Sequence, residues 1–160
     1  MKAKDKTNAL RLLEQKKIDF KSYTHGLPAE RSGAEIAEAL GQDARRVFKT
    51  LVTVSDRSKR YYVFMIPVCG ELDLKKAAKA AGEKSIEMIH AKELLPLTGY
   101  VHGGCSPIGM KKYFPTFIDS SAESFETIFF SGGKVGLQLE MPLSALQSVV
   151  AVTAADITKG

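Results

Sequence analysis

The chain has 160 residues, an apolar fraction of 44% and a net charge of +5 from 23 basic and 18 acidic side chains. This length fits one domain with a substantial core, and no run of about 20 apolar residues predicts a membrane span. The two cysteines are too few for a disulfide framework, and the three scattered histidines have no metal-ligand spacing, so we expect no metal site.

The N-terminal segment is charged and lacks the apolar stretch of a secretory signal, so we expect a cytoplasmic protein. The basic excess is moderate: it suits a surface that meets polyanions such as tRNA, although many basic proteins bind none. No repeat, low-complexity tract or linker interrupts the chain, which predicts a single domain over residues 1–160.

Helical spacing and capping residues predict the helices. Thr7 is a plausible N-cap of the first helix, and Ser32 with Glu35 three residues later forms a capping box for the second. Asp73 and Gly82 are suited to begin and end the third. The predicted helices cover residues 7–18, 31–41, 72–82, 91–97, where Pro96 limits the length, and 142–149, where Pro142 opens the first turn.

Runs of β-branched and aromatic residues predict the strands. Two pairs of these strands form hairpins, one with a polar connection and one with a glycine turn. Helices and hairpins mix without a regular βαβ rhythm, so we expect an α+β fold with a mixed, largely antiparallel sheet. The predicted strands are 19–25, 47–54, 60–68, 84–89, 115–121, the two arms within 127–141, and 149–153.

Lys49 lies among apolar neighbours in the predicted strand 47–54. Alternation along a strand places Lys49 with Val47 on one face and Thr50 with Phe48 on the other. The commoner explanation of such a lysine is an edge position with a snorkelling stem. The functional alternative is an ammonium in a cleft, able to hold a phosphate or to polarise a carbonyl. Both interpretations stay open.

The turn Ser131–Gly132–Gly133–Lys134 is rich in glycine but does not match a phosphate loop, because the glycines are adjacent and valine follows the lysine. An ordinary hairpin turn is the simpler interpretation. If the turn faces a cleft, its free N–H groups and the Ser131 hydroxyl are suited to bind an oxyanion.

The loop HGGCSP offers two further interpretations. Gly103 and Gly104 allow the backbone to approach a ligand closely, and Pro107 stiffens the residues after it. Cys105 is suited either to be a small buried apolar residue or to act as a nucleophile with His102 as its base. The packing interpretation is the more frequent one for a free cysteine.

Five motifs occur in order: VFKTLV, ELDLKKAAKAAG, TGYVHGGCSPIGMKK, PTFIDSSA and SGGKVGLQLEM. Together they resemble the YbaK/EbsC family, freestanding relatives of the editing domain inserted in bacterial prolyl-tRNA synthetases. The similarity runs from about Thr7 to the C-terminus. It implies an α+β domain with a curved, barrel-like mixed sheet flanked by helices.

The resemblance also implies an activity: removal of a wrongly attached amino acid from tRNA in trans. The YbaK branch acts on Cys-tRNA(Pro) and Cys-tRNA(Cys), with no metal or organic cofactor. In that branch the substrate's own thiol attacks its ester and leaves as a cyclic thiolactone. Positioning and oxyanion stabilisation then carry the reaction. The partners implied are mischarged tRNA and prolyl-tRNA synthetase.

The same motifs imply the site residues. Lys49 matches the essential lysine of the Lys-Thr-Leu motif, which implies that it anchors the terminal adenosine and its phosphate and orients the ester. The loop matches the family's G-x-x-x-P segment, whose backbone cradles the aminoacyl group. Tyr23 is matched to an aromatic at the pocket mouth. The substrate-binding residues implied are Tyr23, Thr50, Gly103, Gly104, Cys105, Ser106, Pro107, Ser131, Gly132 and Gly133.

Two positions depart from the family pattern. Many relatives carry an aspartate where this chain has Gln138, and an aliphatic residue where it has Cys105. Because of Gln138, the alternative that the protein acts on a different mischarged substrate, such as alanyl-tRNA with water as nucleophile, stays open. The basic composition and the absence of a catalytic triad in the sequence leave a non-catalytic module that binds tRNA or a synthetase open as well.

Overall fold

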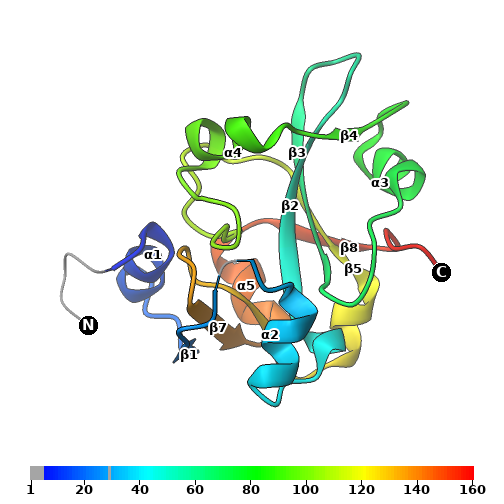
Figure 1. Cartoon of the computed structure of the whole chain (residues 1–160). Helices are drawn as coiled ribbons and strands as arrows, with labels where there is room; N and C mark the ends of the chain where they lie inside the picture. The colour runs from blue at the N-terminus through cyan, green and yellow to red at the C-terminus, as the bar shows by residue number, and fades with distance from the viewer. Residues whose placement is uncertain (1–5, 29) are drawn as a thin grey trace.

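A computed structural model describes residues 6–28 and 30–160, and short helices and strands alternate along it (Figure 1). No helix in these residues is long and apolar enough to cross a membrane. The elements are α1 (Asn8–Gln15), β1 (Lys21–Thr24), α2 (Gly33–Ala39), η2 (Ala44–Arg46), β2 (Phe48–Val54), β3 (Tyr61–Pro67), α3 (Leu74–Ala81), β4 (Glu87–Met88), α4 (Ala91–Thr98), β5 (Thr116–Asp119), η3 (Ser120–Ser124), β6 (Ile128–Ser131), β7 (Leu137–Met141), α5 (Leu143–Val149) and β8 (Val152–Ala155).

Two sheets meet at one point. Their strand orders are β1-β7-β6 and β4-β2-β3-β5-β8, and a parallel bridge between Val47 and Phe129 joins them. The pairs β3–β5 and β5–β8 are parallel, and the other pairs are antiparallel. This confirms a single α+β domain with a mixed sheet flanked by helices. In the described residues β1 and β8 do not pair, so the sheet is not a closed barrel. The barrel-like curvature stays a prediction.

The caps predicted from the sequence are present. The Thr7 hydroxyl accepts a hydrogen bond from the Leu10 N–H at the start of α1. Ser32 and Glu35 form the capping box of α2. Asp73 caps α3, and Gly82 ends it in the left-handed conformation that glycine adopts without steric cost.

Several predicted bounds were wrong. Helix α4 is short, as predicted, but ends one residue later, at Thr98: Pro96 lies in its last turn, where it costs only one main-chain hydrogen bond, and left-handed Gly99 follows. Pro142 is the N-cap of α5 rather than part of its first turn. The closing strand begins at Val152 rather than at residue 149, because α5 extends to Val149 and β8 then pairs in parallel with β5. The strands β1 and β4 are shorter than predicted.

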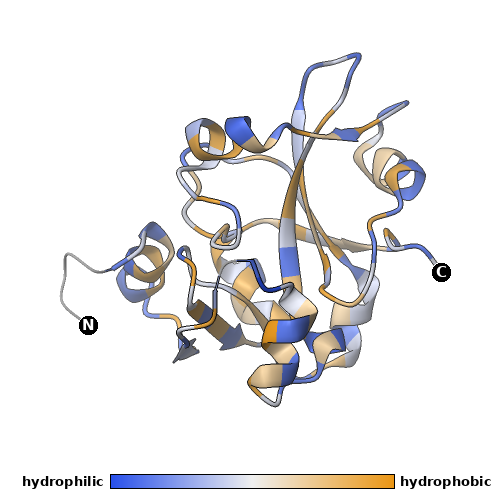
Figure 2. Cartoon of the chain, in the orientation of Figure 1, coloured by the Kyte–Doolittle hydropathy of each residue, from blue (hydrophilic) through white to orange (hydrophobic). Residues whose placement is uncertain are grey.

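The two faces of β2 pack against different parts of the core. Phe48 lies in the main apolar cluster with Phe130, whereas Val47 packs with Phe129 and with Ala37 of α2. The predicted alternation along this strand is therefore confirmed. Figure 2 shows apolar residues along much of the central strands, and hydrophilic residues at loop tips and on parts of the helices.

Candidate functional site

A row of polar side chains crosses one face of the sheet. Ser131 on β6 lies directly opposite Gln138 on β7, which lies opposite Tyr23 on β1. Residues directly opposite one another in antiparallel strands point to the same face. A parallel bridge pairs Val47, just before β2, with Phe129 on β6. Lys49 and Ser131 each lie two residues further along their strands, so they hold equivalent positions and point to the same face as the bridge residues. Lys49, Ser131 and Tyr23 therefore share one face.

The Lys49 side chain is partly buried on this face. Within residues 6–28 and 30–160 its ammonium has no hydrogen-bond or ion-pair partner. A partly buried lysine without a carboxylate partner among these residues fits both a snorkelling stem and a ligand for a phosphate or carbonyl oxygen. Both interpretations left open by the sequence therefore stay open.

Beyond Lys49 the face carries a hydrogen-bonded carboxylate. Glu140 accepts hydrogen bonds from the hydroxyls of Tyr23 and Thr127, and the Arg46 guanidinium lies 3.4 Å from it. Burial pushes the pKa of Glu140 up, but the two hydroxyls and nearby positive charge outweigh it, so its pKa is lowered. Arg46 also lies 5.1 Å from the centre of the Phe129 ring. This network holds the Tyr23 ring in place.

A cavity of about 510 Å³ opens beside the row. Tyr23 and Phe129 line it from the strands, and Leu40 and Gln42 line it from the end of α2. The Gln42 amide donates to Gln138 at 2.7 Å, while its own carbonyl oxygen is buried without a partner in the described residues. Lys49 does not line this cavity.

The two glycine segments are packed against each other, where the segment after α4 runs between the β6–β7 turn and β2 (Figure 1). A Cβ on Gly104 would lie 2.8 Å from backbone atoms of Lys134 and Val135. A Cβ on Gly133 would lie 2.9 Å from the Tyr100 ring. The structure therefore brings these segments together, and only glycine fits at both contacts.

The loop 103–107 contains backbone donors that are not used internally. The Ser106 hydroxyl accepts from the Ile108 N–H at 3.2 Å, but the N–H groups of Cys105 and Ser106 themselves have no hydrogen bond to any described residue. Both residues are buried. Buried N–H groups are nearly always paired, so these two are candidate donors to a ligand.

Cys105 is not arranged as a nucleophile. Burial raises the pKa of its thiol to about 12, although a hydrogen bond with Thr98 acts in the opposite direction. His102 is exposed and makes no hydrogen bond with Cys105 among the described residues. Since the thiolate is the reactive form, the geometry favours the packing role.

Thr50 lies on the opposite face from Lys49. It stands between Phe48, which shares a core cluster with Ile108, and Val52, which shares one with Cys105, so its face of β2 is the one turned to the core around the glycine loop. Its hydroxyl oxygen is buried without a partner in the described residues. The predicted site residues thus form two groups: one along the polar row with Lys49, and one around the glycine loop with Thr50.

The profile of the aminoacyl-tRNA editing domain family matches residues 28–149. The chain belongs to this family. One curated relative is EbsC of Enterococcus faecalis (strain ATCC 700802 / V583), which is ascribed Cys-tRNA(Pro)/Cys-tRNA(Cys) deacylase activity. The two proteins are 46% identical, over 98% of this chain and 96% of EbsC. It is also 32% identical to part of the proline–tRNA ligase of Shouchella clausii (strain KSM-K16), over 70% of the chain but only 20% of the ligase.

Solved structures share this fold. A crystal structure ascribed to a trans-editing enzyme for prolyl-tRNA synthetase is 25% identical, with a TM-score of 0.82 over 96% of both chains. The protein APE2540 shares the fold with a TM-score of 0.85 at 23% identity, over 95% of this chain and 99% of its own.

Sequence reasoning missed Glu140, Arg46 and Gln42 in the editing domain. Strict alternation along the hairpin would have placed Glu140 on the face of Ser131, but no comparable signal links Arg46 or Gln42 to that face. Among the described residues no group of three or more histidine, cysteine or acidic side chains is arranged to hold a metal ion.

Proposed function

We propose that this chain is a trans-editing deacylase that removes cysteine from mischarged Cys-tRNA(Pro), and from Cys-tRNA(Cys), in the cytoplasm. The observation that carries the proposal is the 46% identity to EbsC over nearly the whole of both chains. The ligase match of 32% identity supports a link to prolyl-tRNA synthetase, and we propose that the two proteins act side by side on the same tRNA.

The proposed reaction uses the substrate as its own nucleophile. The cysteine sulfur bonds to the ester carbonyl carbon, the bond from that carbon to the ribose oxygen breaks, and the thiol proton ends on the released oxygen. The products are a cyclic thiolactone and free tRNA. Well-oriented intramolecular attack reaches effective molarities of about 10⁵ M or more, so placement alone is a large part of catalysis.

The protein groups have three proposed roles. Lys49, without a partner among the described residues, holds the phosphate of the terminal adenosine and orients the ester. The N–H groups of Cys105 and Ser106, which have no hydrogen-bond partner in the part of the chain that the structure describes, stabilise the negative charge that develops on the carbonyl oxygen. Ser131 and Tyr23, on the face of Lys49, border the part of the site that takes the terminal nucleotide, and Gly132 and Gly133 lie beside the loop that takes the aminoacyl group. The raised pKa of the Cys105 thiol, about 12, supports a mechanism without a protein nucleophile.

The test is a panel of charged tRNAs: Cys-tRNA(Pro), Cys-tRNA(Cys), Ser-tRNA(Pro) and Ala-tRNA(Pro), each incubated with catalytic amounts of the protein. We expect loss of the cysteine esters only, with thiolactone as the first product by mass spectrometry. Cysteine released directly as the free acid would contradict the thiolactone route. Tight tRNA binding without turnover of any ester would contradict an enzyme.

A second substrate is favoured by one feature. Gln138, where many relatives have aspartate, is bound to Gln42 at 2.7 Å, so a neutral amide pair replaces a charge on the polar row. A neutral wall suits a small uncharged aminoacyl group such as alanine, with water as nucleophile. Faster hydrolysis of Ala-tRNA(Pro) than of Cys-tRNA(Pro) in the panel would establish this alternative.

A further inference from the structure

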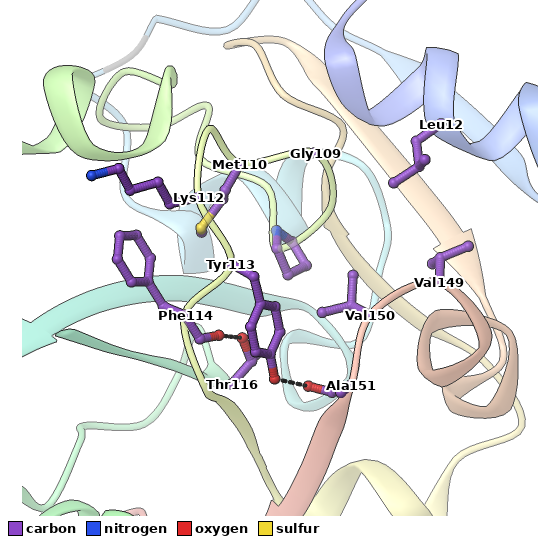
Figure 3. Close-up of a pocket in the computed structure, with 11 residues that line it drawn as sticks. Leu12, Gly109, Met110, Lys112, Tyr113, Phe114, Thr116, Val149, Val150 and Ala151 are labelled. Carbon is purple, nitrogen blue, oxygen red and sulfur yellow. Dashed lines mark hydrogen bonds between the residues drawn. The ribbon is translucent and has the colours of Figure 1, made fainter. Parts of the chain in front are cut away.

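Figure 3 shows a second cavity, of about 440 Å³. One of the residues that line it is Pro107, the last residue of the glycine loop. Its other walls come from α1, from segment 107–116 and from the junction of α5 with β8. A ligand here would therefore lie next to the loop that we assign to the aminoacyl group. None of the site residues proposed above other than Pro107 lines this cavity.

The walls of the cavity are held by hydrogen bonds and ring contacts. Tyr113 is 63% exposed, yet its hydroxyl donates to the Ala151 carbonyl at 3.1 Å, which fixes the ring along the cavity edge. Phe114 packs against the Tyr61 ring at 5.6 Å, and the Thr116 hydroxyl donates to the Phe114 carbonyl at 2.8 Å. A preformed apolar site of this size with one exposed aromatic is suited to a flat ligand.

The rim of the cavity is positive. Segments 107–116 and 142–155 contain no acidic residue, whereas Lys112, which lines the cavity, is exposed, as is its neighbour Lys111. Neither lysine forms an ion pair with a described residue. On α1, the Glu14 carboxylate is bound by Lys6 at 2.6 Å. Together with the net charge of +5, this rim is complementary to a polyanion.

We propose that this cavity receives an unpaired nucleobase from the single-stranded end of the tRNA, with Lys112 beside the adjoining phosphate. Bases without a stacking neighbour bind to exposed aromatic rings flanked by cations, and each such contact is sequence-tolerant. The inference rests on the proposed function only for the identity of the nucleic acid. It adds a binding subsite that holds the tRNA strand while the ester occupies the far side of Pro107.

Stacking is measured with uncharged tRNA(Pro) acceptor minihelices that carry 2-aminopurine, in turn, at each unpaired position before the terminal adenosine. With wild-type protein we expect fluorescence quenching at one of these positions. Tyr113→Phe keeps the ring and retains the quenching, whereas Tyr113→Leu abolishes it. Leu74→Ala, which truncates a side chain of 40% exposure on α3, is the control and leaves quenching unchanged. Quenching that persists in Tyr113→Leu, or is absent in wild type, overturns the proposal.

The phosphate contact is measured by salt dependence. Lys112→Gln lowers the slope of log affinity against log salt concentration by roughly 0.7, as expected for one contact to a single strand. Lys84→Gln, at an exposed lysine outside both cavities, is the matched control and leaves the slope unchanged. Equal slopes in all three proteins would overturn the role of Lys112.

Kinetics separate this subsite from the proposed function. Tyr113→Leu raises KM for Cys-tRNA(Pro) about tenfold with little change in kcat, and leaves cleavage of the small ester cysteinyl-adenosine unchanged. If wild type cleaves neither ester while quenching still depends on Tyr113, the subsite stands and the deacylase proposal falls. If Tyr113→Leu weakens binding of prolyl-tRNA synthetase but not of the minihelix, the cavity is a protein-docking site and our proposal is overturned.

Discussion

Neighbouring residues of the β6–β7 hairpin belong to faces with different tasks. Ile128, Phe130 and Leu139 are fully buried in the main core, so their contribution is to stability. Ser131 and Gln138 lie one position away on the polar row that Lys49 extends onto β2. The contrast shows that alternate side chains of one strand can have different roles: one set packs in the core, and the set on the other face is available to contact a ligand. Stability and activity should therefore respond to different residues of the same strand.

The largest effect is expected on the apolar face. Phe130→Ala removes a ring that is 1% exposed, and the cavity left behind should cost about 3–5 kcal/mol of unfolding free energy. Ser131→Ala, one residue along, loses one hydrogen bond from the Gly133 N–H and should cost only about 1 kcal/mol. Urea unfolding of both variants measures the difference, and equal losses would contradict the division between the faces.

Lys49→Ala tests the polar face. We expect deacylation of Cys-tRNA(Pro) to fall by about 100-fold or more, because a positioned charge is lost, with unfolding free energy changed by less than about 1 kcal/mol. Lys49→Arg keeps the charge and should recover part of the rate, and Lys84→Ala is the control on the surface. Full deacylation activity in the Lys49→Ala variant would contradict the role proposed for this lysine.

Glu140→Gln sharpens the comparison, because it weakens the polar network without leaving a cavity. The pKa of Glu140 lies below its ordinary value of 4.5, so its charged form stabilises the fold above that pH and the contribution is lost as pH falls through the lowered pKa. We expect a loss of about 1–3 kcal/mol near pH 7 that shrinks below about pH 4. Urea unfolding of both proteins near pH 7 and below about pH 4 measures the difference in unfolding free energy. A loss of stability that is the same at the two pH values would count against a charged Glu140.

The smallest effect is expected from the cysteines. With a pKa of about 12, Cys105 is almost entirely thiol, so iodoacetamide near pH 8 should modify exposed Cys69 and spare Cys105. The alkylated protein should keep its activity, and Cys105→Ser should keep nearly all of it, with Cys69→Ser as the control. Complete loss of activity in Cys105→Ser would restore the nucleophile hypothesis.

Local features of the fold could be predicted from the sequence, and non-local ones could not. The caps at Thr7, Ser32 and Asp73 depend on residues within one turn and were confirmed. The parallel pairs β3–β5 and β5–β8 join segments far apart in the chain, and no local pattern reports such contacts. The start of β8 was misplaced for the same reason, since pairing with β5 sets it.

The candidate site shows the same limit. Alternation already placed Lys49 and Thr50 on opposite faces, and the structure confirms it, although the family resemblance had grouped them in one site. The contact between the two glycine segments depends on close backbone packing that composition does not reveal. The assignment of catalytic and binding roles to these residues stays a prediction until the variants are assayed.

The contact of Thr7 with the glycine turn bears on how this chain should be shortened for experiments. The Thr7 hydroxyl begins α1 and also donates to the Gly132 carbonyl at 2.5 Å, so one atom secures both a helix start and the turn. A fragment trimmed to residues 28–149 would lack this hydrogen bond and the core residues Leu10 and Leu13. It would also lack β1, so β7 would become an exposed edge strand, which favours aggregation. If a fragment of that length were inactive, the cause would be the loss of these supporting contacts, and the result would not show that the full chain lacks activity.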